Sequence, residues 1–153
     1  MITIADILSP KHILLDLKAE TQKRSIARVA DLLDGDERVE DWERFCDGVI
    51  AGSACMANES ESAICIAHVR SNAVNEMVMA VGRSVKGIPF DEGKMRVHLV
   101  FVIGVPVALA SDYLRIIGAL ARIFRSEKGE ETLLSAPTRE AFLERLCTLE
   151  MEM

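Results

Sequence analysis

Three histidines, His12, His68 and His98, are the residues of this sequence best suited to nucleophilic or acid–base chemistry near neutral pH. His68 follows the apolar run Ile64–Ala67, so we expect it at the carboxyl end of an inner strand, where α/β sheets commonly place ligands. A neutral imidazole there can act as a nucleophile while a hydrogen bond holds its second nitrogen. On position alone, a half-buried structural histidine is the simpler interpretation of His68. We expect a structural role for His98, near the start of a later strand, and a surface position for His12.

The four cysteines, Cys46, Cys55, Cys65 and Cys147, show no C-x-x-C spacing and no nearby histidine that would complete a zinc site. We therefore expect them to be small, buried apolar residues and predict no metal. The sequence also lacks a P-loop, a dinucleotide-binding glycine motif, a serine-hydrolase elbow and an H-E-x-x-H motif. No cofactor is predicted, and the absence of a signal-peptide pattern predicts a cytoplasmic protein.

The composition is that of a globular chain, and we expect one domain over residues 1–153. Half of the residues are hydrophobic, whereas 18 Lys and Arg against 24 Asp and Glu give a formal charge of −6. That charge is opposite in sign to the footprint of a nucleic-acid binder, so we expect no nucleic-acid partner. The most apolar run, Val97–Ala110, is shorter than the ~20 residues that a bilayer requires, so direct membrane insertion is not expected either.

The hydrophobic periodicity predicts an α/β fold. Nearly continuous apolar runs suit strands that are buried on both faces, which requires helices on both sides of the sheet. We therefore predict a three-layer α/β/α fold with a mixed central sheet of about four to five strands. The expected strands are Ile13–Leu17, Ala63–Val69, Met77–Val81 and Val97–Val105. The expected helices are Thr3–Leu8, one from Thr21 to near Gly35, one from about Asp41 to Gly52, one capped by Ser111, Glu130–Leu134, and Thr138–Leu149.

Three segments, in the right order and spacing, resemble one protein family. The segment Ile64–Arg70 is similar to the "A-I-P-H-[AG]-R" motif of mannitol/fructose-class (type-2) enzyme IIA domains of the bacterial sugar phosphotransferase system, a class that includes nitrogen-regulatory members. Residues 87–106 resemble that family's "G-I-x-F-D…V-x-L-V-F-L-I-A-V-P", and residues 113–125 resemble its "H-L-x-L-L-A-x-L-A-R-L-L-R". The similarity covers essentially the whole chain.

The resemblance implies that His68 accepts a phosphoryl group from a histidine-containing phosphocarrier protein. The group then passes to an enzyme IIB, or its presence serves as a regulatory signal to a target protein. No metal or other cofactor is implied, because the protein needs chiefly to position the acceptor in line and to stabilise charge on the phosphoryl oxygens. Backbone N–H groups, including those at the start of the helix near Ser111, could supply that stabilisation.

Several supporting residues of the family pattern are replaced. The family arginine falls near Asp47 or Gly48, the threonine matches Ala54, and the second histidine matches Tyr113. We expect Ser53 and Tyr113 to line the phosphoryl site, because both keep a hydroxyl, and Arg70 to compensate for the missing cation. Loss of a charge-assisted contact costs roughly 1.5–3 kcal/mol.

Two further interpretations remain open. One is a regulatory binding module that keeps the fold but has lost phosphotransfer, and the other is an unrelated α/β domain that binds a small molecule. For the phosphocarrier, we expect partners to dock on a shallow apolar patch around His68 that includes Val69 and Val74. The sequence leaves open whether the chain forms a homodimer.

Overall fold

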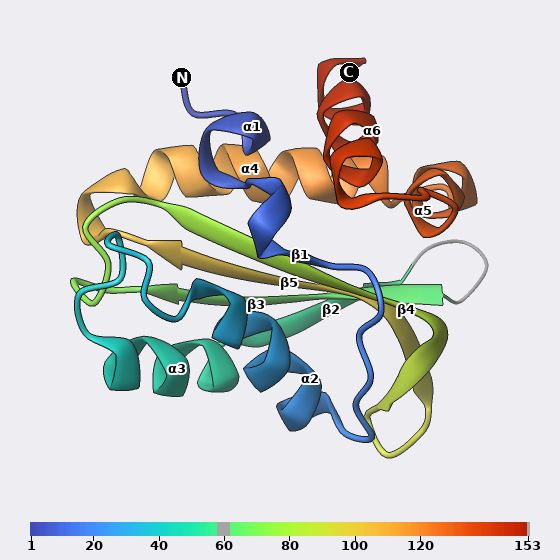
Figure 1. Ribbon diagram of the computed structural model, residues 1–153, viewed down its shortest axis with the longest axis horizontal. Coiled ribbons are helices and arrows are strands. Elements are labelled where there is room, and N and C mark those ends of the chain that lie inside the picture. The colour runs from blue at the N-terminus through green and yellow to red at the C-terminus, as the bar shows by residue number, and fades with distance from the viewer. Residues whose placement is uncertain (58–61, 153) are drawn as a thin grey trace.

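A mixed β-sheet forms the centre of the protein (Figure 1). The computed structural model describes residues 1–57 and 62–152, and within them the strands run in the order β1-β4-β5-β3-β2. Strand β3 is parallel to β5, and β1 is parallel to β4, whereas the β2–β3 and β4–β5 pairs are antiparallel. The strands are β1 Ile13–Leu14, β2 Ser53–Ala57, β3 Ser62–Arg70, β4 Val78–Phe90 and β5 Met95–Val105.

Helices cover both faces of the sheet, which confirms the predicted three-layer α/β/α architecture (Figure 1). One face packs against α1 (Ile4–Ile7), α4 (Ala110–Ile123), α5 (Glu127–Leu134) and α6 (Arg139–Met151). The other face packs against α2 (Gln22–Ala30) and α3 (Trp42–Ala51). Three short 3-10 turns join these elements: η1 (Pro10–His12), η2 (Asp31–Leu33) and η3 (Val107–Leu109).

The inner strands are buried on both faces, as their apolar runs predict. Along β3, Ile64 and Ile66 enter the core beneath α4, while Cys65 and Ala67 enter the core beneath α2 and α3. This alternation follows from the two-residue period of a strand, in which successive side chains point to opposite faces. His68 continues the Ile64–Ile66 series, so its side chain faces the α4 layer.

The structure differs from the sequence prediction at the edges of the sheet. Strand β2 was not predicted, because Ser53–Ala57 is short, lies at an edge and leaves its side chains half-buried or exposed. Its strand conformation depends on antiparallel pairing with β3. Strand β1 is reduced to Ile13–Leu14, whereas β4 continues to Phe90 through an irregularity between Arg83 and Ile88.

Three helices begin at their predicted capping residues, whereas α4 and α5 begin earlier than predicted, α5 at Glu127 instead of Glu130. The Thr21, Asp41 and Thr138 side chains accept hydrogen bonds from the backbone N–H three residues later and begin α2, α3 and α6. Helix α4 was expected to begin at Ser111, but Leu109 occupies the N-cap position and its side chain makes no capping hydrogen bond. The 3-10 turn η3 leads directly into the helix, which places Ser111 inside the first turn.

Candidate functional site

His68 lies near the carboxyl end of β3, between two other strands. Its register partner on β5 is Ile103, and on the other side its backbone N–H donates to the Gly52 carbonyl oxygen at 3.1 Å. Gly52 follows α3 and precedes β2, and a Cβ atom there would lie 2.1 Å from the His68 carbonyl oxygen. A glycine is therefore required for this close approach, which fixes the backbone at His68.

The imidazole of His68 packs against the first turn of α4. Its ring stacks on that of Tyr113, with centroids 5.1 Å apart and an interplanar angle of 30°. Among the residues that the structure describes, Nδ1 of His68 is the only buried side-chain nitrogen or oxygen atom without a hydrogen-bond partner. Burial lowers the pKa of His68 below its ordinary value of 6.5, so the ring is neutral at pH 7. A neutral imidazole has a free lone pair and can act as a nucleophile.

Tyr113 provides an uncharged hydroxyl beside His68. Burial raises the pKa of Tyr113, so the phenol stays protonated and can donate a hydrogen bond at neutral pH. Tyr113 is the fourth residue of α4, a helix whose N-terminus has no side-chain cap. The partial positive charge of a helix N-terminus favours a nearby anion. The arrangement therefore places a nucleophile next to groups that can stabilise negative charge.

The two other predicted site residues occupy different places. Arg70 is exposed at the end of β3, two residues after His68, and therefore projects from the same face of the sheet. Ser53 pairs with Ala67, whose side chain enters the opposite core, and the Ser53 hydroxyl accepts a hydrogen bond of 3.0 Å from Gln22 Nε2 on α2. The structure thus brings His68, Tyr113 and Arg70 to one face of the sheet and directs Ser53 to the other.

The apolar surface near His68 differs from the expected one. Val74 is only 3% exposed and contributes to the core, so it is not available to a partner, and Val69 is half-buried against the same core. The exposed apolar side chains of this region are Val107 in η3, at 45%, and Leu114, at 67% and next to Tyr113 in α4. Sequence reasoning overlooked both. Leu114 could have been found, because it interrupts the polar face of an otherwise amphipathic helix.

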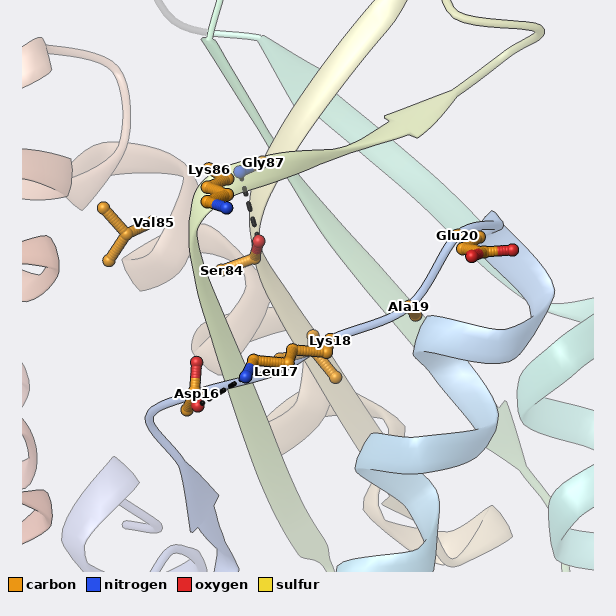
Figure 2. Close-up of a pocket in the computed structure, with 9 residues that line it drawn as sticks. All are labelled: Asp16, Leu17, Lys18, Ala19, Glu20, Ser84, Val85, Lys86 and Gly87. Atoms are coloured by element: carbon orange, nitrogen blue, oxygen red, sulfur yellow. Dashed lines mark hydrogen bonds and ion pairs between the residues drawn. The ribbon is translucent and has the colours of Figure 1, made fainter.

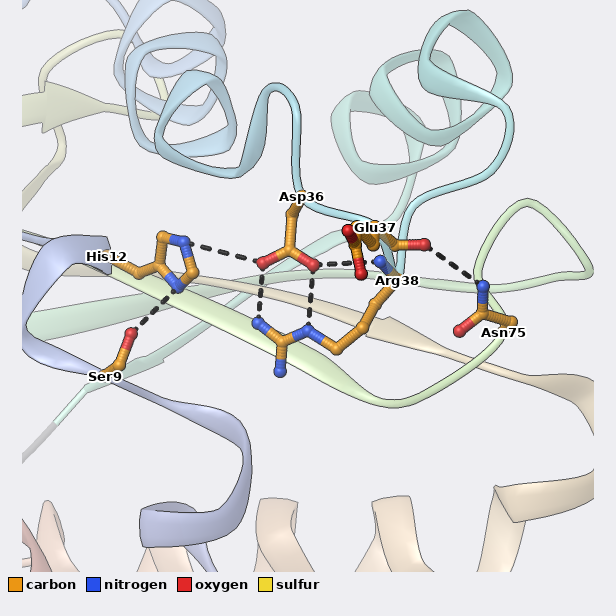
Figure 3. Close-up of polar contacts among 6 residues, drawn as sticks. All are labelled: Ser9, His12, Asp36, Glu37, Arg38 and Asn75. Carbon is orange, nitrogen blue, oxygen red and sulfur yellow. Dashed lines mark hydrogen bonds and ion pairs between the residues drawn. The ribbon is translucent and has the colours of Figure 1, made fainter.

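The remaining histidines have structural contacts. His98 is half-buried, with Nδ1 3.0 Å from the Ser84 carbonyl oxygen. His12 was expected at the surface, but it is 4% exposed because η1 folds against the loop after η2. Its Nε2 lies 3.6 Å from Asp36 Oδ2 and its Nδ1 lies 3.3 Å from Ser9 Oγ (Figure 3).

Asp36 is the centre of that second cluster. Arg38 donates to its carboxylate through Nε at 2.9 Å and Nη2 at 2.8 Å, and these bonds hold the pKa of Asp36 at about 2 (Figure 3). Burial, only partly offset by Asp36, lowers the pKa of His12, so its contact with Asp36 involves a neutral ring at pH 7. Asn75, in the loop after β3, donates to the Glu37 carbonyl oxygen at 3.2 Å. The cluster therefore connects η1, the 34–38 loop and the loop that follows the His68 strand.

A pocket of about 460 Å³ lies at the other end of the sheet (Figure 2). Residues 16–20 and 84–87 line it, and within it Gly87 N–H donates to Ser84 Oγ at 3.1 Å. The adjacent residues Arg83 and Ile88 pair with Leu99 and Val97, near the amino end of β5, whereas His68 pairs with Ile103 near its carboxyl end. This pocket is therefore separate from the His68 site.

Neither a metal-binding cluster nor a membrane-spanning helix occurs in the part of the chain that the structure describes. Within residues 1–57 and 62–152, no group of three or more His, Cys, Asp or Glu side chains is placed to hold a metal ion. In the same part of the chain, no helix has the length and apolar character needed to span a bilayer.

Comparison with known proteins identifies the family. The family model described as "Phosphoenolpyruvate-dependent sugar phosphotransferase system, EIIA 2" matches residues 6–148. The fructose-specific EIIA component of the phosphotransferase system of Haloferax volcanii is 30% identical over 138 residues, which is 90% of each chain. The residues matched by the family model include His68.

Solved structures share the fold. The nitrogen regulatory protein IIA-Ntr from Neisseria meningitidis has a TM-score of 0.81 and 24% identity, covering 94% of this chain and 98% of that one. Enzyme IIA-Mtl from Escherichia coli, solved in complex with phosphorylated enzyme IIB-Mtl, has a TM-score of 0.70 and 19% identity, covering 92% and 97%. From the family match, the relative and the common fold, we conclude that this chain belongs to the EIIA 2 family of the phosphoenolpyruvate-dependent sugar phosphotransferase system.

Proposed function

We propose that this protein is a cytoplasmic phosphocarrier that accepts a phosphoryl group on His68. The donor is a histidine-containing phosphocarrier protein, and the recipient is an enzyme IIB, or a target protein that senses the phosphorylation state. The observation that supports this most strongly is the environment of His68: a neutral, half-buried imidazole at the carboxyl end of β3, stacked on Tyr113 in a chain of the EIIA 2 family.

The burial of Nδ1 favours the other ring nitrogen, Nε2, as the acceptor. Nδ1 is buried, so a donor protein reaches the ring from the side of Nε2. In the reactive tautomer Nδ1 keeps its proton, and the Nε2 lone pair attacks phosphorus. The N–P bond of the donor histidine breaks, and that imidazole recovers its electron pair. The transfer to an enzyme IIB reverses this arrangement, with phosphorylated His68 as the donor.

Three features near His68 can stabilise the negative charge that a phosphoryl group would add. The uncapped N-terminus of α4 and the Tyr113 hydroxyl can donate hydrogen bonds to phosphoryl oxygens, and Arg70 supplies a cation at the end of β3. We leave Ser53 out of this proposed set, because its hydroxyl accepts a hydrogen bond from Gln22 on the other face of the sheet. The exposed Val107 and Leu114 side chains give the docking partner an apolar contact beside the site.

A phosphotransfer assay tests the proposal. The protein is incubated with enzyme I, its phosphocarrier protein and labelled phosphoenolpyruvate. We expect acid-labile label on the wild type and on the control His98→Gln, and no label on His68→Ala. Label retained by His68→Ala, or no label on a wild-type protein that is folded and offered its own donor, contradicts the proposal.

The replacement of charged residues favours one alternative, a regulatory module that binds partners without phosphotransfer. Tyr113 carries no charge at neutral pH, and Asp47, near the position of the family arginine, is exposed and acidic. In this alternative, His68→Ala and His68→Asp bind the partner as tightly as the wild type. In the phosphocarrier, His68→Asp places a negative charge at the site and changes the affinity.

A further inference from the structure

A pair of cysteines faces one another across the β2–β3 ladder. Cys55 and Cys65 are direct register partners in this antiparallel pair, and their side chains hydrogen-bond to each other. Directly opposed residues in such a pair have Cα atoms about 4.5–5.5 Å apart, and a disulfide requires about 4.4–6.8 Å. The native register therefore already has the spacing of a disulfide, although both thiols are free in the structure.

The two thiols differ in access and acidity. Cys55 lies on the edge strand β2 and is half-buried, whereas Cys65 lies on the inner strand β3 and is fully buried. The hydrogen bond with Cys65 lowers the pKa of Cys55, and the same contact together with burial raises the pKa of Cys65. Cys55 is the more accessible thiol, and its lower pKa gives it more of the reactive thiolate form. We therefore expect Cys55 to react first with a soluble reagent.

The other two cysteines lack these features. Burial raises the pKa of both Cys46, on α3, and Cys147, on α6. Cys147 contacts the core on the opposite face of the sheet from Cys55 and Cys65. Cys46 belongs to a helix and has no register partner on β2 or β3. The geometry therefore distinguishes one pair among the four cysteines.

We propose that Cys55 and Cys65 form a reversible intramolecular disulfide by exchange with a small-molecule disulfide such as glutathione disulfide. The Cys55 thiolate attacks one sulfur of the reagent, which forms a mixed disulfide and releases one thiolate. Cys65 then loses its proton and attacks the Cys55 sulfur, which releases the second thiolate. Both released thiolates take up the protons lost by the protein, so two protein thiols are oxidised and one small disulfide is reduced to two thiols.

The bond would covalently attach the edge strand β2 to β3 close to the His68 backbone. Gly52 and Ser53 begin this strand, and the Gly52 carbonyl oxygen accepts from His68 N–H. In the reduced protein no covalent cross-link holds β2, only its ladder hydrogen bonds with β3, the Ser53–Gln22 hydrogen bond and side-chain packing. Oxidation is therefore expected to slow hydrogen exchange of the β2 amides relative to the reduced protein.

Mass spectrometry of the full-length folded protein tests this modification. The protein is equilibrated with defined mixtures of reduced and oxidised glutathione, alkylated at the remaining thiols and digested. We expect a loss of two hydrogens and a crosslinked peptide pair that contains Cys55 and Cys65. The control variant, with Cys46→Ser and Cys147→Ser, should form the same crosslink at the same glutathione ratio.

Single substitutions test the order of the two steps. Cys65→Ser should accumulate a stable mixed disulfide with glutathione on Cys55, and Cys55→Ser should form neither product at Cys65. Because a buried serine can perturb folding, Cys65→Ala is compared in parallel and circular dichroism confirms the fold of each variant. A wild-type protein that remains fully reduced at every ratio, or whose crosslinks involve Cys46 or Cys147 instead, overturns the proposal.

Discussion

At the scale of the residue, the environment of His68 sets the chemistry that its side chain can perform. Burial penalises the charged imidazolium, so the ring remains a neutral nucleophile at physiological pH. The stack with Tyr113 fixes the orientation of the ring, and such aromatic contacts are worth about 0.5–1.5 kcal/mol beyond their buried area. The buried Nδ1 leaves the other ring nitrogen for reaction. Neighbouring uncharged groups therefore set the position, protonation state and orientation of the His68 ring.

The lowered pKa of His68 predicts how the proposed phosphoryl acceptance depends on pH. The protonated ring cannot attack phosphorus, and protonation requires a pH below the folded pKa, which lies under 6.5. The acceptance rate should therefore fall to half of its plateau at a pH below 6.5, lower than an unperturbed imidazole would give. An NMR titration of the His68 ring in the folded protein should give a lower midpoint than in the urea-unfolded chain. A folded midpoint at or above the unfolded one would contradict this expectation.

At the scale of the element, the junction between α3 and β2 positions His68, the proposed acceptor. Helix α3 ends at Ala51, and Gly52 brings the chain within hydrogen-bonding distance of the His68 backbone. The first turn of α4 approaches the ring from the next layer. The site is thus assembled from a strand end, a helix end and a helix beginning, held by the His68–Gly52 backbone hydrogen bond and the His68–Tyr113 ring stack. Their relative placement requires a small residue at the closest approach.

Gly52→Ala is expected to destabilise the protein. The added Cβ would lie 2.1 Å from the His68 carbonyl oxygen, a backbone atom that moves only with β3. Overpacking of this kind costs typically about 1–3 kcal/mol of unfolding free energy. The matched control is Gly118→Ala in α4, where the nearest atom is Arg122 Nη1 at 3.5 Å. That change should stabilise the helix by about 0.5–1 kcal/mol.

Urea unfolding of both variants measures the difference, and the phosphotransfer assay reports on the site. Gly52→Ala should also accept the phosphoryl group more slowly, because the backbone at His68 is displaced. If Gly52→Ala unfolds at the same urea concentration as the wild type, the close approach is not required for folding.

At the scale of the whole molecule, two polar clusters lie at the end of the sheet where β3 and β5 finish. One is the His68 site, and the other is the cluster of His12, Asp36 and Arg38, which joins segments that are distant in sequence (Figure 3). A backbone hydrogen bond links the loop of the second cluster to the loop that follows β3, the strand of His68. In it, the backbone N–H of Asn75 donates to the Arg38 carbonyl oxygen at 2.9 Å. We therefore expect the second cluster to contribute to the global stability of the protein.

Asp36→Asn should reduce the stability of the protein in a pH-dependent way. The pKa of Asp36 is lowered from 3.8 to about 2 in the folded state, so the unfolded chain takes up a proton first as the pH falls. The ionised carboxylate contributes about 2 kcal/mol above pH 3.8, and this contribution disappears between pH 3.8 and about 2.

The test is the difference in unfolding free energy between the wild type and Asp36→Asn across that pH range. The difference should be largest near neutrality and should shrink as the pH falls below 3.8. Asp34→Asn, in the same loop at an exposed position, is the control and should leave stability unchanged. A difference that is constant with pH would show that the Asp36 charge is not the source of the stabilisation.

Local patterns in the sequence determined the layers of the fold. The apolar runs of β3 and β5 predict strands buried on both faces, and Thr21, Asp41 and Thr138 mark helix starts, because periodicity and capping act over a few neighbouring residues. The position of His68 at a strand end follows from the same local reasoning. The family resemblance then distinguished it from the other two histidines, and the match over residues 6–148 confirms the family.

Tertiary structure alone decided which side chains meet. The pairing of β2 with β3 places Cys55 opposite Cys65 and directs Ser53 toward Gln22, and the packing of η1 buries His12. These contacts depend on strand order, register and the face of the sheet, which link residues far apart in the chain. A one-residue change in the β2–β3 register would turn Ser53 and Cys55 to the opposite face of the sheet, and no local pattern in an edge strand as short as Ser53–Ala57 encodes that register.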